Sequence, residues 1–136
     1  MASKLNYSIA AEQAQHAGTV STVGNAGLLY IFSGTQPAST SGADGILVAG
    51  PFTLGTPFAP ASSAALPSVL SPTLPANVNA SASAQATWYR VKTSGGVVVF
   101  DGSAGISAAD MTIGPTTSGQ PVAVTSWSLT SGNSGH

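Results

Sequence analysis

Charged residues are scarce in this chain. Only 5% of its 136 residues are charged, against about 25% in an average soluble domain. The formal net charge is −1, and three basic residues provide no positive patch for a nucleic acid or an acidic membrane surface. We therefore expect neither nucleic acid nor membrane among its partners. The seven charged residues are Lys4, Glu12, Asp44, Arg90, Lys92, Asp101 and Asp110.

Cysteine and long apolar runs are missing as well. The absence of cysteine excludes a disulfide framework and a thiolate metal site. No run approaches the roughly 18 apolar residues that a membrane-spanning helix needs. The first residues, MASKLNYSIAAEQAQ, lack the continuous apolar core of a secretory signal. These absences predict a soluble protein that is made in the cytoplasm.

Candidate catalytic groups are few. His16 lies in the N-terminal segment and His136 is the last residue, so neither is expected to be held rigidly. No serine occurs in a G-x-S-x-G nucleophile motif. Asp101 is better explained by a structural ion pair, whereas Asp44 and Asp110 lie among small residues typical of turns. We expect no enzymatic activity, no cofactor and no metal.

The residues that are present favour a folded, all-β chain. Hydrophobic residues make up 43% of the sequence, which is too many for a typical disordered protein. Short apolar segments alternate with turn signals about every ten residues, as in antiparallel sandwiches. We expect a single antiparallel β-sandwich or jelly-roll-like domain over residues 27–132. An N-terminal arm or short helix occupies residues 1–26, and residues 133–136 form a frayed tail.

Local patterns place the expected elements. Residues 4–17 have helical spacing, and Gly18 is expected to end the helix, with a linker over 18–27. Pro51 follows Gly50 inside one apolar run, which predicts an edge strand or a bulge there. The expected strands cover residues 28–32, 46–55, a short stretch near 68–70, 106–114 and 121–130.

The strongest hairpin signal is VKTSGGVVVFDG, residues 91–102. If Gly95–Gly96 forms a two-residue loop, Arg90 lies opposite Asp101. Their charges are then directly paired on the outer face of the hairpin. Alternation places Trp88 on that outer face and Tyr89 on the core face.

The tract NVNASASAQATWYR, residues 77–90, alternates alanine with polar residues. Period-2 alternation indicates a strand, but alanine is a poor strand former. A continuous strand would turn these alanines outward, in phase with Trp88. Either a turn within Ala80–Gln85 resets the phase, or the small-residue face meets another subunit.

Several short motifs resemble those of small virion proteins of tailed bacteriophages. The most specific is the pair W-Y-R-V and V-F-D-G that flanks the glycine hairpin. The resemblance covers roughly residues 27–132. Its motifs are GLLYIFSGTQPAST (27–40), FTLGTPFAPASS (52–63), ATWYRVKTSGGVVVFDGSAG (86–105), ADMTIG (109–114) and VAVTSWSLTSG (122–132).

This resemblance implies a capsid decoration, or cement, protein. Such a protein is made in the host cytoplasm and binds the capsid exterior as a dimer or trimer. It reinforces contacts between copies of the major capsid protein. The candidate interface residues are Leu5, Tyr7, Ile9 and Trp88.

An alternative function is a tail or fibre accessory β-sandwich that binds host-surface carbohydrate. Its sugar platform would consist of aromatic side chains, although aromatic residues at strand positions more often belong to the core. The aromatic candidates are Trp88, Tyr89, Phe100 and Trp127.

Overall fold

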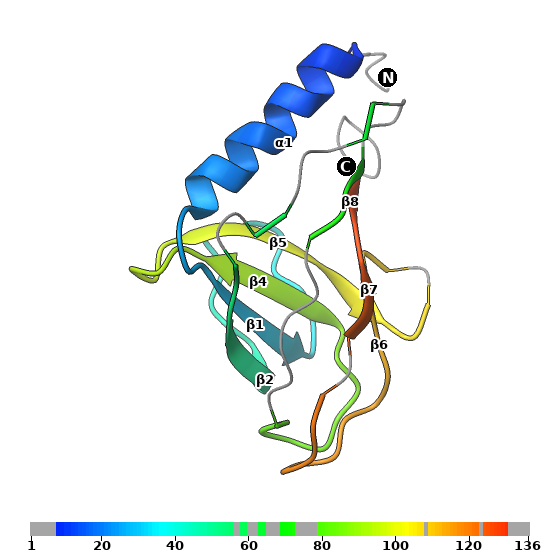
Figure 1. Ribbon diagram of the computed structural model, residues 1–136. Coiled ribbons are helices and arrows are strands. Elements are labelled where there is room, and N and C mark those ends of the chain that lie inside the picture. The colour runs from blue at the N-terminus through cyan, green and yellow to red at the C-terminus, as the bar shows by residue number, and fades with distance from the viewer. Residues whose placement is uncertain are drawn as a thin grey trace.

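The fold is mostly β, with one N-terminal helix (Figure 1). The computed structural model describes residues 8–55, 58–59, 63–64, 69–72, 79–107, 109–122 and 124–130, to which the following description refers. The elements are α1 (Ile9–Val23), β1 (Leu28–Ser33), β2 (Ile46–Thr53), β3 (Val69–Leu70), β4 (Trp88–Lys92), β5 (Val98–Gly105), β6 (Met111–Ile113), β7 (Val124–Trp127) and β8 (Leu129–Thr130).

Six strands form one strongly curled sheet that resembles half a barrel, in the order β2-β1-β4-β5-β6-β7. Strands β3 and β8 form a separate antiparallel pair. The sheet is mixed because β5 and β6 are parallel, so the expectation of a purely antiparallel fold is wrong here. The short connection is closed by reciprocal hydrogen bonds. Ser103 N donates to Asp110 Oδ2 (3.3 Å), and Asp110 N donates to Ser103 Oγ (3.0 Å).

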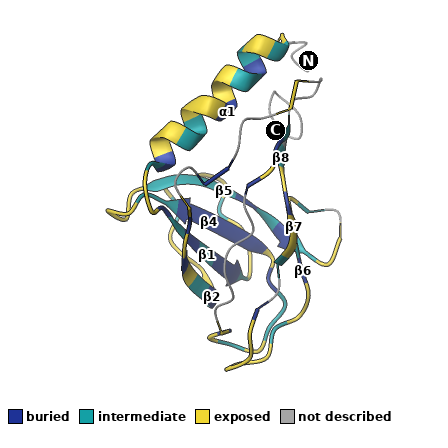
Figure 2. Cartoon of the chain, in the orientation of Figure 1, coloured by how far each residue is buried: buried dark blue, intermediate teal, exposed yellow. Residues whose placement is uncertain are grey.

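The hydrophobic core lies against one face of the curled sheet (Figure 2). Alternation along β4 places Tyr89 and Val91 on this face, where both are fully buried. Leu70 of β3 belongs to the same core, and Leu129 of β8 packs against it. The β3–β8 pair is therefore attached to the large sheet by apolar contact.

Helix α1 is longer than the sequence pattern predicts. The Ser8 side chain caps it by accepting a hydrogen bond from Ala11 N (3.2 Å). The helix continues through Gly18 and ends before Gly24, whose positive φ of 71° suits a glycine. The expected end at Gly18 and the linker over 18–27 are thus wrong. Val23 is the reason, because burial of its side chain in the core draws the last turn onto the sheet.

The β4–β5 hairpin has the expected strand pairing but a different loop. Arg90 pairs with Asp101, as predicted. The loop contains three residues, Ser94–Gly96, because Thr93 N donates to Val97 O (2.8 Å) and Gly96 N donates to Thr93 O (2.9 Å). Gly96 has a φ of 90°, as three-residue hairpin loops require at that position. A bulge between Val91 and Lys92 absorbs the extra residue.

The alternating tract turns back on itself instead of forming a strand. Residues 81–84 are bends, so the expected turn within Ala80–Gln85 is confirmed. Thr116 joins the bend to a later segment: its N–H donates to Ala84 O (2.8 Å), and its hydroxyl lies 2.8 Å from Ala82 O. Small side chains suit this close approach of two backbones. Residues 77–78 lie outside the described part of the chain.

Other predicted strands are present but less regular than expected. The stretch 121–130 divides into β7 and β8, which belong to different sheets, and Ser128 N between them donates to Asp110 O (2.9 Å). Strand β2 is an edge strand with register shifts and a cis Gly50–Pro51 peptide bond, as the proline predicts. The short strand near residues 68–70 is present as β3. The predicted tail, 133–136, lies outside the described residues.

Candidate functional site

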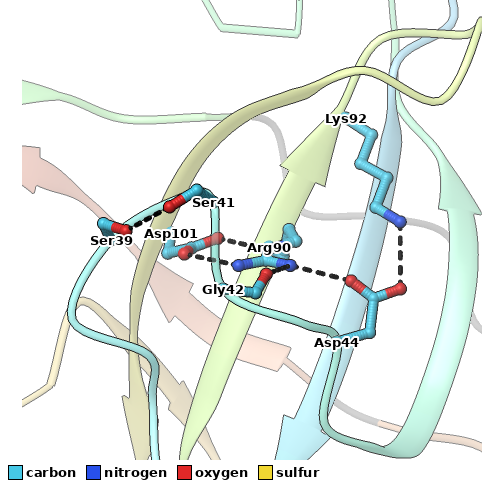
Figure 3. A network of polar contacts seen from close by, with 7 residues as sticks. All are labelled: Ser39, Ser41, Gly42, Asp44, Arg90, Lys92 and Asp101. Atoms are coloured by element: carbon cyan, nitrogen blue, oxygen red, sulfur yellow. Dashed lines mark hydrogen bonds and ion pairs between the residues drawn. The ribbon is translucent and has the colours of Figure 1, made fainter.

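The polar centre of the molecule lies on the outer face of β1, β4 and β5. Alternation along β4 places Trp88, Arg90 and Lys92 on this face, opposite to the core-facing Tyr89. The segment 34–45, which connects β1 to β2, crosses over these side chains (Figure 3). We call this segment the strap.

Arg90 forms a two-pronged ion pair with its cross-strand neighbour. Its Nε donates to Asp101 Oδ1 (2.7 Å) and its Nη2 donates to Asp101 Oδ2 (3.0 Å). Arg90 is 1% exposed, and the Asp101 side chain is 6% exposed. The predicted pair is therefore present but buried, which makes it more consequential than a pair exposed to water.

The strap supplies the remaining partners of this arginine. Arg90 Nη1 donates to Gly42 O (2.8 Å) and to Asp44 Oδ1 (2.9 Å). The other carboxylate oxygen of Asp44 accepts a hydrogen bond from Lys92 Nζ (3.0 Å). One strap carboxylate thus bridges two cationic side chains of β4, as Figure 3 shows.

Aromatic rings line the same face beneath the cations. The Arg90 guanidinium lies 5.1 Å from the ring centroid of Trp88, and Lys92 Nζ lies 4.7 Å from that of Tyr30. Phe32 packs on Trp88 at 4.5 Å between ring centroids. Each cation is therefore stabilised by a ring and by carboxylate oxygens together.

Asp44 and Arg90 are ionised at neutral pH. Partial burial raises the pKa of Asp44, but hydrogen bonds from Lys92 and Arg90 outweigh it, and the net pKa lies below its ordinary value of 3.8. The hydrogen bond to Asp101 raises the pKa of Arg90 further. On the core face, burial raises the pKa of the Tyr89 phenol well above its usual range. Asp44 and Arg90 therefore stay charged and Tyr89 stays neutral, so none of these three groups is suited to exchange a proton near pH 7.

The predicted interface residues are not gathered at one place. Leu5 and Tyr7 lie outside the described residues. Ile9 is half-buried in the first turn of α1. Trp88 is fully buried beneath the strap, so its expected exposure on the outer face is wrong. The strap covers this face, and its small polar residues carry no sequence signal for that position.

Asp44 and Lys92 are the site residues that sequence reasoning missed. Their positions are far apart in the sequence, and Asp44 lies in a tract of small residues that is typical of any turn. The only available signal was the position of Lys92 two residues after Arg90, which places both cations on one face of a strand.

The other charged residues and the histidine of the described part lie away from the strap. Asp110 is exposed, whereas Glu12 and His16 are buried on α1. Within the described residues, no group of His, Asp and Glu side chains could hold a metal ion. No helix in that part of the chain is long and apolar enough to cross a membrane.

Comparisons with protein-family models, with curated proteins and with solved structures found no match to this chain.

Proposed function

We propose that this chain is a structural virion protein of a tailed phage. It binds the outer surface of the capsid as a homo-oligomer and reinforces contacts between major capsid subunits. The motifs around the β4–β5 hairpin suggest this class, and the distribution of charge supports it.

The inward placement of charge carries the proposal. Glu12 and Arg90 are buried, Asp101 is nearly so, and the Lys92 side chain is 15% exposed. Asp44 is 44% exposed but paired with two cations. Asp110 is exposed. The described surface therefore presents mainly hydroxyls, amides, methyls and backbone, which cost less to desolvate at an interface than charged groups do.

Binding of this kind can strengthen a shell. A ligand that binds only the joined state of two subunits stabilises that state by its binding free energy. An oligomer that engages several subunits at once gains further through effective concentration. Individually weak contacts between uncharged surfaces are then sufficient.

The spacing of strands and turn signals in the sequence predicts a complete β-sandwich. We propose that the β3–β8 pair represents the second layer. Leu70 and Leu129 support this assignment, because they join the same core as the large sheet.

Carbohydrate binding receives less support. Sugar-binding platforms need exposed rings, but Trp88, Tyr89 and Trp127 are at most 3% exposed. Phe100 is half-buried and packs against the core. No described residue among the four aromatic candidates thus offers an open ring face.

The test is reconstitution on phage particles that lack the protein. We expect the purified chain to cosediment with them and to raise the temperature at which they release DNA. Because the surface carries little charge, binding should change little between about 0.05 and 1 M salt. Failure of the intact chain to bind these particles contradicts the proposal.

A matched pair of variants asks whether α1 contributes to the contact. Ala14 and Ala17 are exposed on the helix, so Ala14→Glu and Ala17→Glu should leave the fold unchanged. If the helix touches the shell, either charge weakens cosedimentation. The control is Ser94→Glu, an exposed position in the β4–β5 loop, outside both the helix and the strap.

A further inference from the structure

Hydrogen bonds and ion pairs to Arg90 and Lys92 hold the strap on the sheet. The strap covers Trp88 and Arg90, which are at most 1% exposed. Yet none of its own residues is buried, and only Pro37 and Gly42 are half-buried. Segments that bury few apolar groups open at a lower free energy than the rest of a fold. Separation of the strap would expose Trp88 but would leave intact the core on the opposite face of the sheet, to which Trp88 does not belong.

Beneath the strap lies a preformed binding site for a carboxylate. We call Arg90 and Lys92, with the rings of Trp88 and Tyr30 below them, the clamp. Arg90 is fixed by Asp101 whether or not the strap is present. The clamp binds the main-chain carbonyl of Gly42 and the carboxylate of Asp44, which lies two residues later in the strap. Its ligand is thus an extended peptide segment of the form carbonyl-x-Asp.

We propose that the clamp receives the strap of a second copy of this chain, so that two copies are joined by exchanged straps. This inference deepens the homo-oligomer part of the proposed function, on which it rests, by naming the contact between copies. Exchange of an identical element is a low-cost route to a dimer, because every contact broken within a copy is formed again between copies.

The geometry of the strap permits the exchange. Its two ends are held together by the pairing of Ser33 with Ile46 at the end of the β1–β2 hairpin. An extended loop of residues 34–45 reaches about 20 Å from such a base. Gly34, with a φ of 91°, lies at one end of the loop and has no neighbour within 4 Å of the position that a Cβ would occupy. The Gly34 carbonyl accepts a hydrogen bond from the Thr87 hydroxyl, which exchange would break within a copy and form again between copies.

Charge balance favours a second copy over an unrelated acidic segment. A foreign ligand would displace the strap and leave Asp44 without Arg90 and Lys92. Reciprocal exchange leaves each Asp44 paired, and it adds no charge to a surface that has very little. Every copy also carries one strap and one clamp, as a symmetric interface requires.

Complementation between two variants tests the exchange. Asp44→Asn disables the strap but keeps the clamp, and Lys92→Met weakens the clamp but keeps the strap. Mixing the two full-length variants reconstitutes an intact strap–clamp contact only between copies. We expect native mass spectrometry to show a mixed dimer at least about tenfold more abundant than either variant's own dimer. In an equimolar mixture, random pairing makes the mixed dimer twice as abundant as each self dimer. A mixed dimer no more abundant than this overturns the proposal, as does the absence of any dimer.

Two controls keep the result interpretable. Asp110→Asn removes an exposed carboxylate that does not contact the strap, so mixing it with Lys92→Met should give no excess of mixed dimer. A synthetic peptide of residues 34–45 should bind the Asp44→Asn protein and change its tryptophan fluorescence, and the same peptide with Asn at position 44 should bind at least about tenfold more weakly. Equal binding of both peptides overturns the proposal. These measurements use no phage particles, so failure to bind capsids and failure to exchange straps remain separate outcomes.

Discussion

The ring of Tyr89 lies directly over Gly102, its partner on the neighbouring strand. The two residues are opposite each other in the β4–β5 register, and a Cβ at position 102 would overlap the Cζ and hydroxyl of the ring. Tyr89 is fully buried and makes edge-to-face contacts with Phe100 and Trp127. The glycine thus provides the space in which the central aromatic ring of the core lies.

Gly102→Ala should therefore destabilise the domain by about 1–3 kcal/mol, the usual cost of overpacking a core. Urea unfolding followed by fluorescence measures this change. Gly105→Ala, in the same strand, is the matched control, because its nearest neighbours lie 3.8 Å or more from the new Cβ. A similar loss for both variants would show that backbone effects, and not the tyrosine ring, set the cost.

Arg90→Met should cost about 3–5 kcal/mol, because it leaves the buried Asp101 carboxylate without its partner. Adding Asp101→Asn to the same chain removes the stranded charge and should restore part of the loss. Lys92→Ala should cost only about 1 kcal/mol, since its partner Asp44 is 44% exposed. A loss below about 1 kcal/mol for Arg90→Met would contradict the importance of the buried pair.

The sequence predicted the features that depend on local pattern. Alternation and glycine placement indicated the β4–β5 hairpin and the pairing of Arg90 with Asp101. The apolar run at 28–32 correctly indicated a strand. Burial of the Arg90–Asp101 pair was not predictable. It depends on the strap, whose small polar residues specify no particular packing partner.

The candidate site was less predictable for a related reason. Asp44 reaches Arg90 and Lys92 only because β1 lies between β2 and β4, which places the connecting strap above β4. Sheet order is a long-range property that residue spacing does not encode. The parallel β5–β6 pair was missed because hydrogen bonds between Ser103 and Asp110 close a connection that is normally too short for parallel strands.

Two glycines in and after α1 should respond in opposite ways to alanine. Gly18 is exposed inside the helix, with nothing within 4 Å of the new Cβ and no positive φ. Gly18→Ala should therefore stabilise the domain by about 0.5–1 kcal/mol. Gly24 has a φ of 71°, so Gly24→Ala should destabilise it by about 1 kcal/mol. Thermal unfolding measures both. Destabilisation by Gly18→Ala would contradict a helix that continues through this position.

The last prediction concerns the pH dependence of the strap. The pKa of Asp44 lies below its ordinary value of 3.8 in the folded chain. A carboxyl group with a lowered folded pKa contributes stability that is fully present above its unfolded pKa. This contribution is lost as the pH falls through the folded value. We therefore expect strap contacts to weaken below about pH 4 and to stay constant from there to neutral pH. NMR titration of the Asp44 carboxyl and amide hydrogen exchange of residues 34–45 measure the two effects.

Asp44→Asn is the control, because it carries no titrating group at this position. In this variant, the amide protection factors of residues 34–45 should be low at neutral pH and should not fall further as the pH passes through the range in which Asp44 of the intact chain titrates. In the intact chain, acidification should open the strap, because protonation of Asp44 removes the negative charge that pairs with Arg90 and Lys92. Tryptophan fluorescence should then change in step with the Asp44 titration, because Trp88 lies beneath the strap. Two results would show that the carboxylate does not hold the strap in place. One is an Asp44 pKa at or above 3.8, and the other is amide protection of residues 34–45 that does not change with the Asp44 titration.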